Sequence, residues 1–203
     1  MQATPNPSTQ KRRQHIINSA TEIFCEHGYD GASMSAIAAK AGGSKGTLYN
    51  YFPSKDELLL AAMLAEAEKF QHDLTHNLDK AQSLKSVLSQ IIHRIVNKLY
   101  VEPRTAQLLR VVISVGNRSD IGQKFFTIVG DGIWGRIQQL LEEKIASGQL
   151  RNTDAKAMLL TLRGLCEVDL MRLLMGAMPN FNKEQAEQRS ERILEAFFKQ
   201  FEA

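Results

Sequence analysis

Apolar residues recur at intervals of three and four positions through most of the chain after Pro53. This spacing places them on one face of a helix, and it predicts two long helices before Pro103. Neither Gly nor Pro occurs between these two prolines, which favours long helices because both residues are poor helix formers. The apolar positions are Leu59, Met63, Ala67, Phe70, Leu74 and Leu78 in the first helix, and Val87, Leu88, Ile91, Ile92, Ile95, Val96 and Leu99 in the second.

The helical pattern continues to the C-terminus. One helix is expected to end at Gly148, and two more from about Thr153 to Ala177 and from Asn182 to Glu202. The segment 108–115 is apolar almost all round and fits a buried strand or a central helix, and its helical neighbours favour the helix. No segment has the pattern of a convincing strand, so we expect an all-α fold.

The first quarter of the chain is different, because five glycines crowd it and predict short elements with tight connections. We expect a helix over Thr9–Glu26, a short helix capped by Ser33 and a third helix over Lys45–Phe52 capped by Ser44. Two short helices joined by a Gly-containing turn are typical of the helix-turn-helix, whose second helix can enter the major groove of DNA. Pro53 marks the expected boundary, so the predicted domains are residues 1–53 and 54–203.

The overall charge of the chain is compatible with a small DNA-binding face. The chain has 25 Lys and Arg against 22 Asp and Glu, a net charge of +3, which excludes a protein that coats nucleic acid by charge alone. Lys11, Arg12 and Arg13 open the first helix, where cations oppose the helix dipole. Phosphate contact would account for this placement, and a solvated helix start is the alternative.

Other features exclude several classes of protein. Cys25 and Cys166 match no metal-ligand spacing, so we expect two reduced, buried thiols. The longest apolar run, Leu58–Ala65, is too short to span a membrane, and Met1–Ser8 lacks the core of a signal peptide; the expected location is the cytoplasm, with no membrane contact. His72 and His76 are four residues apart, but no acidic partner motif accompanies them, so we expect a solvated helix face and neither metal nor cofactor.

The run from Ala38 to Leu58, AAKAGGSKGTLYNYFPSKDEL, resembles the DNA-binding signature of the TetR family of transcriptional regulators. Upstream residues at positions 20, 24, 28, 29 and 37 fit the same pattern. The chain departs from the family at Gly43, where Val or another apolar residue is usual, so a looser turn is expected. It also departs at Asn50 and Tyr51, since His is frequent at one or the other position.

The resemblance implies a homodimeric repressor that binds a palindromic double-stranded DNA operator and is released by a small-molecule effector. The alternative is a helical small-molecule-binding or interaction protein without operator binding. An enzyme is not expected, because no nucleophile elbow, Gly-rich phosphate loop or acidic metal cluster is evident. The candidate DNA-binding residues are the cations, caps and polar residues Lys11, Arg12, Arg13, Ser33, Ser35, Ser44, Lys45, Gly46, Thr47, Tyr49, Asn50, Tyr51 and Lys55.

The resemblance also implies that the C-terminal domain binds the effector and that its last two long helices pair with their copies. Apolar helices fit a hydrophobic or aromatic effector. Polar and aromatic residues within these helices are its candidate contacts: Arg110, Phe126, Asp131, Trp134, Glu167 and Asp169. Buried ion pairs or dimer contacts explain the charged ones equally well. The candidate dimer residues are Leu162, Leu170, Leu173, Leu174, Leu194, Phe197 and Phe201. For the phenylalanines, the core of their own chain is the alternative.

Overall fold

The computed structural model describes residues 6–75, 83–118 and 120–203. This part of the chain is all-α, as predicted, and its β-type pairing is an isolated bridge between Leu150 and Glu202. None of the helices in these ranges is long and apolar enough to cross a membrane. The same ranges hold no cluster of three or more His, Cys, Asp or Glu suited to a metal ion, and His76 lies outside them.

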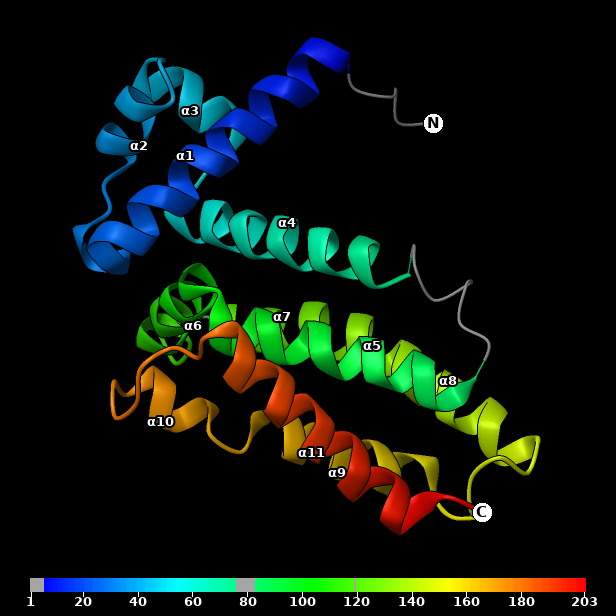
Figure 1. The fold of residues 1–203 in the computed structure, drawn as a ribbon. Helices are drawn as coiled ribbons and strands as arrows, with labels where there is room; N and C mark the ends of the chain where they lie inside the picture. Colours follow the sequence, from blue (N-terminus) through cyan, green and yellow to red (C-terminus); the bar gives the residue numbers. More distant parts are fainter. Residues whose placement is uncertain (1–5, 76–82, 119) are drawn as a thin grey trace. The chain divides into compact units, whose positions relative to one another are not determined.

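Figure 1 shows the order of the helices along the chain. Two segments, η2 and η3, are wound as π-helices. The bounds are α1 Pro7–Gly31, α2 Met34–Lys40, α3 Lys45–Tyr51, α4 Lys55–Thr75, α5 Leu84–Val96, η2 Asn97–Val101, α6 Pro103–Val115, α7 Ile121–Phe125, η3 Phe126–Trp134, α8 Gly135–Ala146, α9 Ala155–Glu167, α10 Leu170–Leu174 and α11 Lys183–Phe201. The helix over 108–115 is confirmed, whereas the one expected from Thr153 to Ala177 is divided into α9 and α10.

Most of the predicted caps are present. The Ser33 hydroxyl accepts the Ala36 N–H at 3.0 Å, and the Ser54 hydroxyl accepts an N–H at 3.1 Å at the start of α4. Asn182 and Gln185 form a capping box at the start of α11. The cap of α9 is Asp154, whose carboxylate accepts the Lys156 N–H at 3.0 Å. These side chains satisfy helix N–H groups that would otherwise lack partners.

The chain packs into two compact units, of which the first is Met1–Ala67 with Gln107–Phe125. Its core combines α1, α2 and α3 with the start of α4 and with α6 and α7. Leu58, Leu59 and Ala62 of α4 are fully buried there. The packing units therefore do not divide at a single point near Pro53, because apolar residues beyond this proline complete the core around the first three helices.

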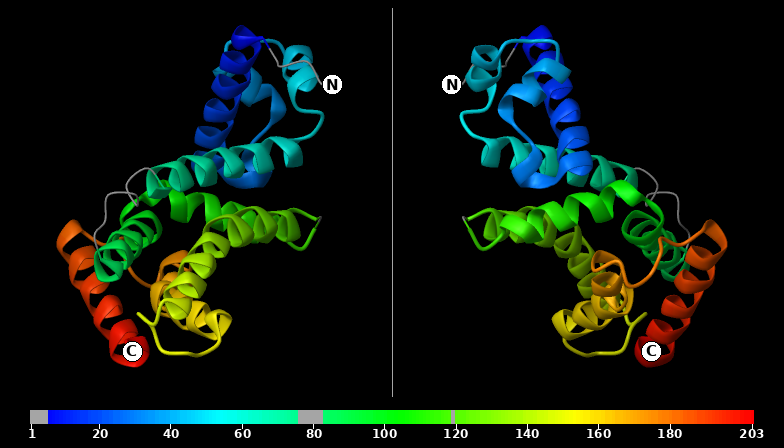
Figure 2. Two further views of the ribbon diagram at one scale, coloured as in Figure 1. Left: turned by 90° about the vertical axis from the view of Figure 1, so that its right-hand side faces the viewer. Right: turned by 90° about the vertical axis from the view of Figure 1, so that its left-hand side faces the viewer.

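The second unit is Glu68–Ala106 with Phe126–Ala203. Within it α5 packs along α11 and α8 packs against α9 (Figure 2). Tyr100 lies at the centre of this core, where its hydroxyl donates to the Cys166 carbonyl at 2.8 Å and its ring stacks on Phe181. Cys166 is buried as predicted, Cys25 is only partly buried, and neither forms a disulfide. Burial raises the pKa of Cys166 to about 12, which keeps its thiol protonated at neutral pH.

Candidate nucleic-acid interface

The turn between α2 and α3 is held by the backbone itself. Gly42 adopts a positive φ of 66°, a conformation that glycine accommodates without steric cost. Its N–H donates to the Ala39 carbonyl, and the N–H of Gly43 donates to the Ala38 carbonyl, each at 3.0 Å. The turn at Gly43 is therefore closed by main-chain hydrogen bonds, so the looser turn expected from this glycine is not found.

The third helix has one buried face and one exposed face. Leu48 is buried in the core of the first unit and fixes the orientation of α3. The Ser44 hydroxyl caps the helix by accepting the Thr47 N–H at 3.0 Å, and it lies 2.9 Å from the Thr47 hydroxyl. Candidate residues on the exposed side are Lys45, Gly46, Tyr49 and Asn50, while Thr47 and Tyr51 are half-buried. The capped start of the helix and its polar side are therefore both accessible.

The second helix presents two further candidates. The Ser33 side chain caps α2, whereas Ser35, in the first turn of the helix, is exposed.

Lys45 and Tyr49 on α3 form a cation–π contact, with the Lys45 ammonium 5.8 Å from the centre of the Tyr49 ring. A cation over an aromatic face keeps its charge. This arrangement leaves both side chains on the outer side of α3.

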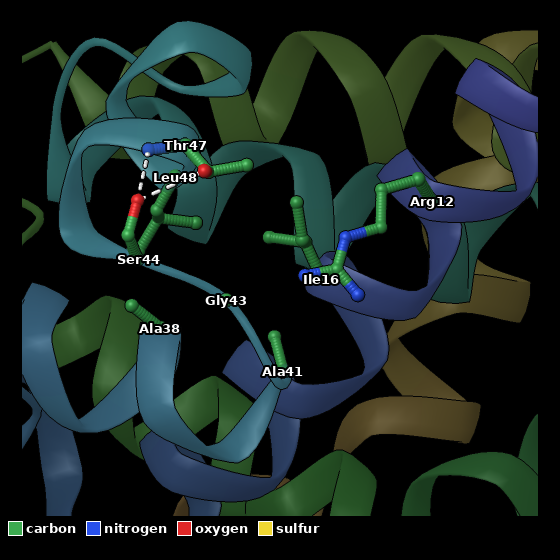
Figure 3. Close-up of a pocket in the computed structure, with 8 residues that line it drawn as sticks. All are labelled: Arg12, Ile16, Ala38, Ala41, Gly43, Ser44, Thr47 and Leu48. Atoms are coloured by element: carbon green, nitrogen blue, oxygen red, sulfur yellow. Dashed lines mark hydrogen bonds between the residues drawn. The ribbon is translucent and has the colours of Figure 1, made fainter.

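Two of the basic residues that open α1, Arg12 and Arg13, contact the residues on either side of α3. Lys11 and Arg13 are exposed and Arg12 is half-buried. An Nη of Arg12 donates to the Gly42 carbonyl at 3.1 Å, and Figure 3 shows this guanidinium beside the turn that precedes α3. The guanidinium of Arg13 lies 4.9 Å from the centre of the Phe52 ring, directly after α3. The three cations and the exposed side of α3 thus belong to one compact unit.

Lys55 has a structural task that the sequence did not suggest. Its ammonium donates to the carbonyls of Tyr29 and Ala32, at 2.7 and 2.9 Å, and lies 4.0 Å from the centre of the Tyr29 ring. The Tyr29 hydroxyl in turn donates to Asp56. Burial, and then the hydrogen bond to Asp56, raise the pKa of Tyr29 to about 12. Lys55 therefore joins the end of α1 to the start of α4, and its contact with phosphate stays a prediction.

Two charged effector candidates of the second unit, Glu167 and Asp169, are engaged in ion pairs. Glu167 accepts from Arg163 Nε at 2.9 Å, and the same guanidinium lies 5.6 Å from the centre of the buried Trp134 ring. Asp169 lies 3.2 Å from Arg172 and 3.3 Å from Arg189. Ion pairs within the chain, the alternative explanation for these carboxylates, are what the structure contains.

The remaining effector candidates do not gather around these ion pairs. Phe126 is 60% exposed, and Arg110 is an exposed residue of the first unit. The side chain of Asp131 lies outside the described residues. The structure thus brings together Trp134 and Glu167 through Arg163, and it leaves the role of each candidate in effector binding a prediction.

Most candidate dimer residues fill the core of their own chain. Leu162, Leu173, Phe197 and Phe201 are buried in the second unit. The other three are half-buried and pack against the same core: Leu170, Leu174 and Leu194. The aromatic residues of α11 therefore have the intramolecular role that was the alternative to dimer contact.

A different apolar stripe is left on α9 and α10. Leu160, Val168, Met171 and Met175 are between 59% and 77% exposed. They recur every three or four residues together with Gly164, where an added Cβ would meet nothing within 4 Å. The same spacing in the sequence could have revealed this second apolar face, but the buried face of α9 carries the stronger pattern. We refer to these five residues as the apolar stripe.

Comparison with known proteins accounts for nearly the whole described chain. The model for bacterial regulatory proteins of the tetR family matches residues 16–62, and the model for the C-terminal domain of AefR-like transcriptional repressors matches residues 86–203. The fatty acid metabolism regulator protein of Bacillus subtilis is 26% identical over 144 residues, which are 70% of this chain and 73% of that protein. The regulator SrpR of Pseudomonas putida is 26% identical over 158 residues, which are 77% and 72% of the two chains.

Solved structures share the fold. A TetR-family regulator from Mesorhizobium loti superposes with a TM-score of 0.86 at 24% identity, over 98% of this chain and all of the other. The flavonoid-responsive regulator FrrA superposes with a TM-score of 0.69 at 28% identity, over 95% and 98% of the two chains. These likenesses extend from the first helix to the last and so include both compact units.

Proposed function

Because the chain belongs to the TetR family of bacterial transcriptional regulators, we propose that it is a homodimeric repressor released from a palindromic operator by a small apolar molecule. Like its relatives, the chain is a DNA-binding regulator and not an enzyme. The roles of its individual residues in DNA binding are assigned below. The observation that carries the assignment is the capped helix α3, which exposes polar side chains beside the basic start of α1.

Two kinds of DNA contact follow from the position of each side chain. Lys45, at the first residue of α3, binds a backbone phosphate together with the helix-capping residues Ser44 and Thr47. Tyr49 and Asn50 lie farther along the exposed side, where an amide can read adenine and a phenol can contact base edges. The first group supplies affinity for any DNA and the second supplies sequence preference.

The apolar stripe is the proposed dimer contact. A two-fold dimer buries the same patch on both copies, so five exposed positions of one chain become ten buried positions in the pair. Gly164 at the middle of the stripe lets the two helices approach closely, since no side chain separates them. Apolar residues exposed in this number on two consecutive helices mark a protein interface, and dimerisation is typical of the family.

We assign the effector to the second unit. The fatty acid metabolism regulator of B. subtilis is a sequence relative, and a solved FadR structure from the same species, 22% identical to this chain, holds stearoyl-CoA. FrrA is described as flavonoid-responsive. A hydrophobic or aromatic effector fits both comparisons. The π-helices η2 and η3 belong to this unit, and π-helical turns often occur at functional sites.

Release of the operator is a shift between two populations of the dimer. Recognition helices bind two half-sites when they lie about one DNA turn apart, roughly 34–36 Å. An effector that binds more tightly to a dimer with another spacing favours that dimer and lowers operator occupancy. A difference of a few kcal/mol in its affinity for the two states is sufficient.

Selection from random-sequence DNA tests operator binding directly. The purified full chain should enrich a palindrome, and fluorescence anisotropy on that duplex should then follow the affinity of variants. Lys45→Ala should weaken binding to operator and random duplex alike and lower the slope of log affinity against log salt by about 0.9 per protomer. Lys199→Ala, which removes an exposed lysine of α11, is the matched control. Failure to enrich any palindrome would refute the proposal, and an unchanged slope would remove Lys45 from the contacts.

The same duplex tests sequence reading and the effector class. Tyr49→Phe or Asn50→Ala should change the enriched sequence if these residues reach base edges. Stearoyl-CoA and the flavonoid naringenin are the two probes for release, each added to the preformed complex. Release by either one supports an apolar effector, and resistance to both up to the solubility of each would contradict this class.

A further inference from the structure

The backbone conformation of Gly43 does not require a glycine. Gly42 occupies the left-handed region of the turn, whereas Gly43 does not. Any L-residue can adopt such a backbone conformation. The N–H of Gly43 is fixed by its bond to the Ala38 carbonyl, and replacing the side chain would leave that bond in place. The reason for glycine must therefore lie in the space beside it.

A guanidinium fills that space. A Cβ built on Gly43 would lie 2.6 Å from Nη2 of Arg12, closer than carbon and nitrogen atoms approach without overlap. The same nitrogen donates to the Gly42 carbonyl at 3.1 Å. Figure 3 shows Arg12 beside the turn, with its guanidinium on the side of Gly43 that faces α1. Arg12 thus occupies the position that a side chain at residue 43 would otherwise take.

We propose that Arg12 binds an operator phosphate and that the missing side chain of Gly43 holds it in position to do so. The proposal rests on the operator binding described above. A guanidinium has five N–H groups, and the Gly42 carbonyl engages only one of its nitrogens. Within the described residues Arg12 pairs with no carboxylate, so its charge is not neutralised. Its place against Gly43, the residue before the Ser44 cap, adds a cation to the turn from which α3 begins.

The arrangement explains why the chain departs from the family signature at this position. An apolar side chain at residue 43 would displace the guanidinium from the Gly42 carbonyl, and Arg12 would then sample many rotamers in solvent. A phosphate contact made from such an ensemble is weaker, because the ordering of the side chain must be supplied on binding. Gly43 and Arg12 are therefore a coupled pair, and Gly43 acts through Arg12.

A double-mutant cycle measures the coupling. The variants are Arg12→Ala, Gly43→Ala and the combination, with affinity and salt slope measured by anisotropy on a labelled random-sequence duplex and on the selected operator. Arg12→Ala should weaken binding by roughly tenfold, the equivalent of one charge-assisted hydrogen bond, and lower the salt slope by about 0.9 per protomer. Gly43→Ala should have most of that effect, and adding it to Arg12→Ala should change little.

Two controls separate this coupling from general effects. Lys11 is an exposed neighbouring cation, so Lys11→Ala should weaken binding independently of Gly43 and combine additively with Gly43→Ala. Gly135→Ala adds a Cβ that meets nothing within 4 Å, and it should leave DNA affinity unchanged. Thermal unfolding of each variant should show an intact fold, since the group displaced by Gly43→Ala is the end of a flexible side chain.

The outcomes are distinct. A loss from Gly43→Ala that is most of the loss from Arg12→Ala, without further loss in the combination, supports the coupled pair. Additive losses, or a Gly43→Ala variant that binds as tightly as the wild type, overturn it. Unchanged affinity and salt slope in Arg12→Ala overturn the phosphate contact itself. A wild-type chain that binds neither duplex refutes operator binding as such and is thereby distinguished from failure of this inference.

Discussion

Replacing Met171 by alanine should weaken self-association of the chain. Met171 lies on α10 near the centre of the apolar stripe and is 60% exposed. Leu160 and Val168 precede it on the same stripe and Met175 follows it. If this stripe is the dimer contact, a second copy covers the surface that the chain itself leaves open, and truncation removes part of it.

The size of the effect follows from the exposed fraction. Complete burial of a methionine side chain contributes about 1.5–3 kcal/mol. Since 60% of Met171 is still exposed, a second copy would contribute about 1–2 kcal/mol from each chain. A two-fold interface contains the residue twice, so Met171→Ala should cost roughly 2–4 kcal/mol, a 30- to 1000-fold increase in the dimer dissociation constant.

Sedimentation velocity over a range of protein concentrations measures this constant. Ile113→Ala is the matched control, because Ile113 is 58% exposed but belongs to α6 of the first unit and not to the stripe. It should leave dimerisation unchanged. Operator affinity should fall with the loss of dimer and recover at high protein concentration, since each half-site needs one recognition helix.

An unchanged dissociation constant in Met171→Ala would refute the assignment if Leu160→Lys also left the dimer intact. A lysine at position 160 would place a charge within an apolar contact, and two-fold symmetry doubles that charge. A dimer that tolerates both changes must associate through another surface. Met171→Ala should be close to neutral in the unfolding of the monomer, because the alanine removes surface that the monomer does not bury.

Three further predictions concern the scaffold. Ser44→Ala should lower the free energy of unfolding by about 1 kcal/mol and reduce operator affinity, whereas threonine at this position should retain the cap; equal losses in urea unfolding would contradict the capping role. Gly122→Ala should destabilise the chain by about 1–3 kcal/mol in thermal unfolding, because its Cβ would lie 2.8 Å from the backbone carbonyl of Gly116, and an unchanged Tm would contradict this close approach. Tyr100→Phe should cost about 1–2 kcal/mol near neutral pH by removing the hydrogen bond to Cys166. Burial raises the pKa of Tyr100 from 10.0 to about 12, so between these values the unfolded chain loses a proton that the folded chain keeps, and stability falls as pH rises. The cost of Tyr100→Phe should therefore shrink by about 1 kcal/mol between pH 8 and pH 11, and a constant difference would show that the phenol is not desolvated.

Features set by neighbouring residues could be predicted from the sequence. The caps at Ser33, Ser44 and Asn182 depend on a side chain and an N–H two or three positions away, and all three are present. The all-α fold follows from helical spacing in the same way. The family could also be identified, because its signature is one uninterrupted run over α2 and α3.

Features that join distant residues could not be predicted. Arg118 forms an ion pair with Asp30, 88 positions away, and nothing in either local sequence indicates it. Periodicity identified Phe197 as apolar and helical, but it could not decide whether the ring is covered by its own chain or by a second copy. The structure answers this for the monomer, since Phe197 is fully buried in the second unit.

The cations of the first unit show how local and distant effects combine. Arg12 and Lys55 were predicted to contact phosphate because both stand where the helix dipole disfavours positive charge. Each cation donates to neutral carbonyl groups. Arg12 donates to the Gly42 carbonyl, and Lys55 donates to the carbonyls of Tyr29 and Ala32. A carbonyl positions a cation without cancelling its charge, whereas a carboxylate would do both. Within the described residues neither of these cations pairs with a carboxylate, so a chain with a net charge of only +3 can still keep uncancelled positive charge in its first unit.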